Sequence, residues 1–149
     1  MKRLLLILVA MGCVGSVQAQ QTETPSWSDR AVSTSIAVAK NIYQRVQKEG
    51  KPLADRMLRA APEYYKGAQS QLQALIKRVD KADIPKTFGE KQRMALELWK
   101  IRSAINVMAL SDPEVLKTLL NYRPEAVQKM QKDLAQTETK LKKANLPGF

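Results

Sequence analysis

Basic side chains recur at helical spacing along two stretches of this 149-residue sequence. In each stretch they occupy the side opposite an apolar stripe, and Glu63 is the only acidic residue among the first set. Rows of cations attract phosphate-rich polymers, anionic lipid headgroups or acidic proteins, and such binding depends strongly on salt. The alternative is an ordinary solvated helix face. The candidate anion-binding residues are Arg56, Arg59, Lys66, Lys77, Lys81, Lys129, Lys132, Lys140 and Lys143.

A second candidate surface lies in the stretch from 88 to 110, which is apolar on two sides. One arc contains Met94, Leu98, Ile101, Ile105 and Met108. The opposite arc is the candidate partner-binding face and contains Leu96, Trp99, Val107 and Leu110. Two interpretations are open. The stretch is either a central helix with neighbours on both flanks, or it presents a groove or dimer surface around Trp99, because Trp is favoured at interface hot spots.

Most catalytic chemistry is excluded by the residues that the sequence lacks. It contains no His, and its single Cys is Cys13. These absences remove Ser-His-Asp triads, zinc and copper sites built from His or Cys, and haem ligation by His. The sequence also has no G-x-S-x-G, Walker A, G-x-G-x-x-G or EF-hand motif. We therefore expect no catalytic residues, no metal and no cofactor.

Proline residues divide the sequence into stretches of helical periodicity, and no stretch alternates as a strand would. The expected helices are a short one after Pro113 and four long ones at about 28–49, 52–82, 88–110 and 124–144. The apolar stripe keeps its phase across Pro62, which predicts one long second helix kinked there. Thr87 and Glu90 form a capping box at the start of the third long helix.

The expected fold class is therefore all-α. The elements form an antiparallel helical bundle of four long helices, the second kinked at Pro62, plus one short helix.

The N-terminal residues are predicted to be an export signal. Residues 1–3 carry positive charge, a short apolar run follows at 4–11, and Ala19 supplies the small side chain that a signal peptidase requires. Cleavage before Gln20 would make residues 1–19 a signal peptide. The expected location is the periplasm or the exterior of the cell.

Cleavage there leaves a flexible leader at 20–27 and a single helical domain at 28–149. Two alternatives stay open. The apolar run could be an uncleaved anchor, although a spanning helix needs about 20 apolar residues. Residues 10–13 resemble a bacterial lipobox, which would make the protein a lipoprotein anchored through Cys13.

The net charge of the chain and its predicted compartment determine how we rank the expected functions. The chain has 25 Lys and Arg residues against 14 acidic residues, a net charge of +11. The first expectation is a non-catalytic interaction protein: an adaptor, an inhibitor or a chaperone-like binder of another polypeptide. The second is a binder of anionic envelope polymer or lipid headgroups, and the third is a small enzyme with an Arg and Lys clamp for an anion. A homodimer is a further alternative. Nucleic acid is not expected as a partner, because the basic rows contain no aromatic residues for base stacking.

Overall fold

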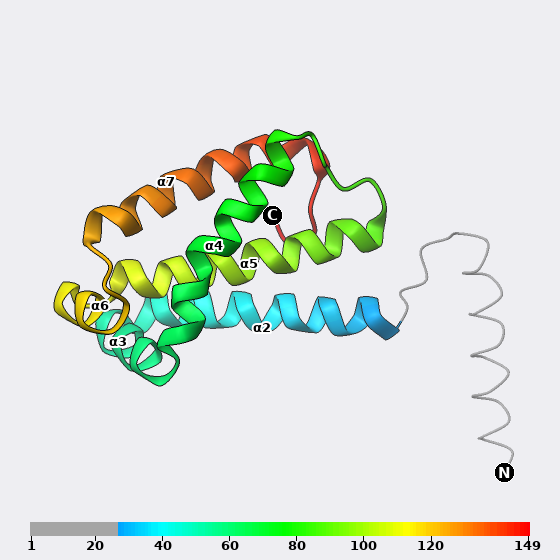
Figure 1. The fold of residues 1–149 in the computed structure, drawn as a ribbon. Coiled ribbons are helices and arrows are strands. Elements are labelled where there is room, and N and C mark those ends of the chain that lie inside the picture. The colour runs from blue at the N-terminus through cyan, green and yellow to red at the C-terminus, as the bar shows by residue number, and fades with distance from the viewer. Residues whose placement is uncertain (1–26) are drawn as a thin grey trace, which may run out of the picture. The chain divides into compact units, whose positions relative to one another are not determined.

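The computed structural model describes residues 27–149, and every regular element in that range is a helix (Figure 1). The elements are α2 (Trp27–Glu49), α3 (Lys51–Ala60), α4 (Pro62–Asp80), α5 (Phe88–Leu110), α6 (Pro113–Leu120), α7 (Pro124–Leu141) and the 3₁₀ helix η1 (Lys142–Ala144). The all-α prediction is confirmed. Two units divide the chain, Met1–Ala31 and Val32–Phe149, and the hydrophobic core lies in the second.

The predicted signal peptide at 1–19, its Cys13 and nearly all of the predicted leader at 20–27 lie outside the described residues. Trp27 begins α2, one residue before the predicted start, and helix ends commonly vary by that much. Among the helices of residues 27–149, none combines the length and the apolar character needed to cross a membrane.

Helix α5 is the centre of the packing. It packs against α3, α4 and α7, and side chains of α2 contact it as well. Both of its apolar arcs contribute to the core, for example Leu98 and Ile105 from one and Val107 from the other, each at most 2% exposed. A helix that is apolar around most of its circumference is stable only when it is surrounded. This is the arrangement that the central-helix interpretation describes.

Helix α2 lies beside α5 and runs in the same direction. Three contacts follow one another in the same order along both helices: Ser33 with Gln92, Tyr43 with Trp99, and Gln47 with Asn106. Two of these contacts are hydrogen bonds, of 3.2 Å from the Gln92 amide and 2.6 Å from the Gln47 amide. Polar pairs therefore flank an aromatic contact along this interface.

Helices α4 and α7 also run in the same direction against each other. The Tyr122 hydroxyl, just before α7, donates to the carbonyl of Lys66 near the start of α4 at 3.1 Å. At the other end, Lys140 Nζ lies 2.6 Å from Asp80 Oδ1. Both helices thus end at the same place, where Figure 1 shows the end of α4 beside the final turn of α7.

The prediction of one long helix kinked at Pro62 is wrong. The chain forms two helices separated by Ala61, whose backbone is extended at φ −148° and ψ 62°. Proline has no N–H to donate into a helix and disfavours helical geometry in the residue before it, so Pro62 begins a new helix. The stripe nevertheless identified the buried side of both helices, because Leu58 and Leu72 are each fully buried.

Other helix ends follow their local sequence. The Thr87 hydroxyl accepts a hydrogen bond from the backbone N–H of Glu90, and the Glu90 carboxylate accepts one from the N–H of Thr87, so the predicted capping box is confirmed. Gly50 separates α2 from α3 at φ 71° and ψ −148°, a backbone conformation that favours glycine.

Candidate functional site

All nine candidate anion-binding residues are exposed. Three of them form ion pairs: Lys66 with Glu63 at 3.2 Å, Lys129 with Asp133 at 2.6 Å, and Lys140 with Asp80 at 2.6 Å. The other six make no ion pair with another residue of the range 27–149, and they are Arg56, Arg59, Lys77, Lys81, Lys132 and Lys143.

The break at Ala61 divides the first basic row. Arg56 and Arg59 lie on α3, whereas Lys66 and Lys77 lie on α4, so the row predicted for one helix is split between two. Arg59 is instead close enough to Asp112 to contribute to lowering the pKa of that carboxyl group, for which a hydrogen bond from Lys51 is the larger cause.

Lysines of α4 and α7 converge where the two helices end. Lys77 lies one turn before Asp80, and Lys143 lies one turn after Lys140 in the 3₁₀ helix η1. The contact between Lys140 and Asp80 places the ends of α4 and α7 side by side, and we call the four lysines at these ends, Lys77, Lys81, Lys140 and Lys143, the terminal lysine cluster. Cations at helix C-termini are also favoured by the helix dipole, which is their purely structural role.

The candidate partner-binding residues of α5 are located mainly inside the molecule. Val107 is fully buried and Trp99 is 6% exposed, while Leu96 and Leu110 are half-buried. The Trp99 ring packs edge-on against Tyr43, with ring centroids 5.8 Å apart, and lies 5.0 Å from the ring of Phe149. The exposed part of this face is therefore small.

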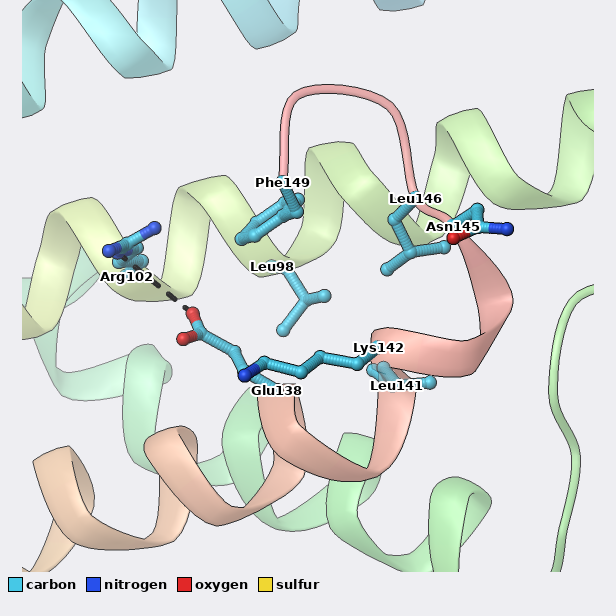
Figure 2. Close-up of a pocket in the computed structure, with 8 residues that line it drawn as sticks. All are labelled: Leu98, Arg102, Glu138, Leu141, Lys142, Asn145, Leu146 and Phe149. Carbon is cyan, nitrogen blue, oxygen red and sulfur yellow. Dashed lines mark ion pairs between the residues drawn. The ribbon is translucent and has the colours of Figure 1, made fainter.

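A cavity that the sequence did not indicate lies between α5, α7 and the residues after η1 (Figure 2). Its volume is about 250 Å³. Four apolar side chains and four polar ones line it: Leu98, Leu141, Leu146 and Phe149, and Arg102, Glu138, Lys142 and Asn145. A second hollow of about 160 Å³ borders Arg102 and Glu138 on their other side, towards Tyr43 of α2.

Arg102 is held by aromatic rings. Its Cζ atom lies 4.9 Å from the ring centroid of Trp99, 5.1 Å from that of Tyr43 and 5.9 Å from that of Phe149. Each contact is within the range in which a guanidinium is attracted to an aromatic ring. Within residues 27–149 the Arg102 side chain makes no hydrogen bond, and its charge partner is Glu138, with Nε and Oε1 3.9 Å apart.

Glu138 is an incompletely satisfied acid. Its Oε1 atom is buried and accepts no hydrogen bond from the described residues, because the 3.9 Å separation from Arg102 is too long for one. Burial raises the pKa of the Glu138 carboxyl group, and the nearby Arg102 charge opposes that rise. Figure 2 shows the two side chains facing each other across the edge of the cavity. An arginine and a carboxyl group whose pKa is raised by burial therefore share one partly apolar cavity.

No sequence signal pointed to this cavity. Arg102 and Glu138 come from distant stretches of the chain, and in the sequence each is an ordinary charged residue on a helix. Helical periodicity places Arg102 between the two apolar arcs of α5, which says only that it lies beside the core. Knowing that α7 crosses α5 at this point is necessary to bring the two together.

Residues 27–149 contain no cluster of acidic, His or Cys side chains suited to holding a metal ion. Searches of protein families, of curated proteins and of solved structures find no match to this chain.

Proposed function

We propose that the protein is an exported, non-catalytic binding protein that attaches to anionic surfaces of the cell envelope through its basic side chains. The ligand chemistry is a dense array of phosphate or carboxylate groups, as lipid headgroups or an acidic polymer would supply. The observation that carries the proposal is that all nine basic residues are exposed and six of them form no ion pair within residues 27–149.

The terminal lysine cluster is the centre of this contact surface. Among the ion pairs within residues 27–149, the one that involves these four lysines joins Lys140 to Asp80. Each lysine held near an anionic membrane contributes about 1 kcal/mol to attachment, so a few together are sufficient for binding at low salt. Cleavage before Gln20 removes Lys2 and Arg3, and the 23 basic against 14 acidic residues that remain give a net charge of +9, which adds long-range attraction in the same direction.

Binding to defined surfaces tests the proposal. The protein is sedimented with vesicles containing phosphatidylglycerol, with vesicles of phosphatidylcholine alone, and with an immobilised acidic polysaccharide. We expect binding to the anionic vesicles, to the acidic polysaccharide or to both at about 0.05 M salt and its loss at about 0.5 M. Binding to one but not the other identifies the source of the anionic groups. Binding to neither, or binding that resists salt, contradicts the proposal.

A matched pair of variants locates the surface. Replacing Lys77 and Lys143 by Gln removes two cluster charges, and replacing Lys48 and Lys117 removes two exposed charges near the ends of α2 and α6. Both double variants lose the same net charge and comparable helix-dipole contacts. The cluster variant should bind anionic vesicles about thirtyfold more weakly, and the control should lose much less. Equal losses would mean that only net charge matters.

A polypeptide partner is the second candidate function, and one observation favours it. Val38 of α2 and Tyr64 of α4 are large hydrophobic residues that are 53% and 49% exposed, and both line a groove of about 290 Å³ that also reaches α5. Such a groove would suit an apolar side chain of an adaptor target, inhibited enzyme or unfolded client. This site takes the place of the Trp99 face, most of which is buried.

Crosslinking in the intact envelope tests the second candidate. A photo-crosslinking residue is placed at Val38 and, as a control, at Phe88, which is similarly exposed at 50%. Reproducible capture of one protein from Val38 and not from Phe88 supports an adaptor or inhibitor, and capture of many unfolded proteins supports a chaperone-like role. Equal capture from both positions, or none from either, contradicts this candidate.

Export itself is part of the proposal and has a direct test. The protein isolated from the envelope fraction should begin at Gln20 when its N-terminus is sequenced. A lipid-modified Cys13 at the start would instead establish the lipoprotein alternative, and retention of Met1 in the cytoplasm would contradict export.

A further inference from the structure

We propose that the cavity between α5 and α7 binds a small amphipathic carboxylate, with the carboxylate group on the guanidinium of Arg102 and the apolar body among Leu98, Leu141 and Leu146. This site is distinct from the surface of the proposed function, and its occupant is a single molecule instead of a charged array. The geometry of Arg102 carries the inference.

The surroundings of the Arg102 guanidinium favour binding of a planar anion. Three aromatic rings surround its guanidinium, at 4.9 Å for Trp99, 5.1 Å for Tyr43 and 5.9 Å for Phe149. Contacts with several rings restrain a guanidinium, whose N–H groups form a fork that matches the geometry of a carboxylate. Those N–H groups make no hydrogen bond with the described residues, although the side chain is only 34% exposed.

The apolar walls set the size of the ligand. A cavity of about 250 Å³ compares with the 150 Å³ of an engineered cavity that accepts benzene, which suggests a ligand of roughly ten heavy atoms. Each methylene group that enters should strengthen binding about fourfold. A carboxylic acid with about six to nine carbons in an unbranched or phenyl-bearing chain satisfies both limits.

The charges around the cavity favour an anion over a cation. Arg102 and Lys142 both line it, and Glu138 is the one acidic side chain among its lining residues. Figure 2 shows the Lys142 side chain extending along the cavity from η1 towards Glu138. A ligand ammonium group would meet two cations and one acid. A ligand carboxylate would meet two cations and an acid that protonation can neutralise.

Glu138 can become neutral by taking up a proton when the ligand binds. Burial already raises the pKa of this group, and a ligand carboxylate beside it would raise the pKa further by repulsion. The neutral acid would then donate its O–H to the ligand carboxylate. The titratable and charged groups facing Glu138 from neighbouring elements are Arg102 of α5, Lys142 of η1 and Tyr43 of α2. Binding should therefore take up a proton and become tighter as the pH falls.

Titration calorimetry on the full chain tests the site. The probes are octanoate, 3-phenylpropanoate, octanol and octylamine. Octanoate or 3-phenylpropanoate should bind at least about tenfold more tightly than octanol, which lacks the anion that Arg102 pairs with. Tighter binding of octylamine than of the acids would overturn the proposal, because it would make Glu138 the anchor. Absence of binding by both acids would also overturn it.

Variants separate the roles of the two charged groups. Arg102→Gln should weaken binding of the acid about tenfold to hundredfold, while Arg78→Gln, which removes an arginine of α4 outside the cavity, should leave binding unchanged. Between about pH 7 and about pH 5.5, wild-type affinity should rise by up to about tenfold per pH unit, and Glu138→Gln should remove that dependence.

The pH measurement keeps the proposal falsifiable even if Arg102→Gln fails to fold. Identical pH profiles for the wild type and Glu138→Gln would contradict it, as would unchanged affinity in a folded Arg102→Gln.

Discussion

The rings of Trp99 and Phe149 lie 5.0 Å apart with an interplanar angle of 34°, which joins the segment after η1 to the central helix. The backbone also approaches closely at Gly148, where a Cβ atom would lie 3.3 Å from Trp99 Nε1. Lys40 of α2 approaches the same indole, 5.3 Å from the ring centroid. One buried side chain therefore connects α2, α5 and the segment 145–149.

Loss of the indole should destabilise the whole domain. Trp99→Ala leaves a cavity in the core and should cost about 3–5 kcal/mol of unfolding free energy. Phe149 is 51% exposed, so Phe149→Ala removes mainly the ring contact, at about 0.5–1.5 kcal/mol. Urea unfolding followed by circular dichroism measures both. A Trp99→Ala protein as stable as wild type would show that the residue serves an interface and not the core.

Substitution of alanine for Gly50 and for Gly67 should change the stability of the domain in opposite directions. Gly50 adopts φ 71° and ψ −148°, and no atom lies within 4 Å of the position that an alanine Cβ would take there. Gly50→Ala should therefore cost about 1–3 kcal/mol from backbone strain alone. Gly67 lies within α4, where an added Cβ has an ordinary contact at 3.9 Å with Gln71, so Gly67→Ala should stabilise by about 0.5–1 kcal/mol. Chemical denaturation measures the change in unfolding free energy for each variant. A change of the same sign in both variants would refute this account of the turn.

The contribution of the capping box at the start of α5 to the stability of the domain should be measurable by itself. Thr87→Ala removes the hydroxyl that accepts the Glu90 N–H at 3.2 Å and should cost about 1 kcal/mol. Thr87→Ser keeps the hydroxyl and is the matched control, expected to stay close to wild type. Thermal unfolding compares the three proteins, and equal midpoints for the alanine and serine variants would mean that the cap is not formed in solution.

Glu138 and Glu90 should give stability of opposite pH dependence. Burial raises the pKa of Glu138 above 4.5, so its contribution is fully present below that value and is lost as the pH rises through the raised pKa. Hydrogen bonds from the N–H groups of Lys86 and Thr87 lower the pKa of Glu90, so its contribution is present above 4.5 and is lost as the pH falls through the lowered pKa.

Melting temperatures across this pH range check the two signs. Relative to wild type, Glu138→Gln should gain stability as the pH rises from about 4 to about 7, whereas Glu90→Gln should lose stability over the same interval. The reverse order for either variant would mean that the contacts of that carboxyl group are not those in the structure.

Local sequence signals predicted much of the helical framework. Helix α5 starts at Phe88 because the Thr87 side chain caps it. Helices α6 and α7 start at Pro113 and Pro124 because proline, which has no N–H, suits the first turn of a helix. The apolar stripe also identified which side of α4 is buried. These features depend on neighbours within a few residues, so the sequence carries them directly.

The break at Ala61 shows where such signals are ambiguous. An apolar stripe that continues in phase across Pro62 is compatible with one kinked helix or with two helices that face the same central helix. Leu58 and Leu72 are buried in either case. Pro62 disfavours helical geometry at Ala61 and so permits either a kink or a full break, and the packing of α3 against both α5 and α6 accompanies the full break.

The residues of the basic surface could be predicted from the sequence, whereas the contacts between helices at both candidate sites could not. The nine exposed basic residues could be identified because side chains opposite an apolar stripe face solvent. The convergence of the terminal lysine cluster and the pairing of Arg102 with Glu138 depend on how α7 crosses α4 and α5. No periodicity within a single helix encodes that crossing.

Lysine reactivity measured on the bound protein tests the central claim most directly. Acetylation is followed residue by residue with mass spectrometry, with and without the anionic surface that the protein binds. At about 0.05 M salt, Lys77, Lys81, Lys140 and Lys143 should be protected, while Lys48 and Lys117 should react as in the free protein, and about 0.5 M salt should restore reactivity. Equal protection of both sets, or protection of Lys48 and Lys117 alone, would contradict the claim that this face makes the contact.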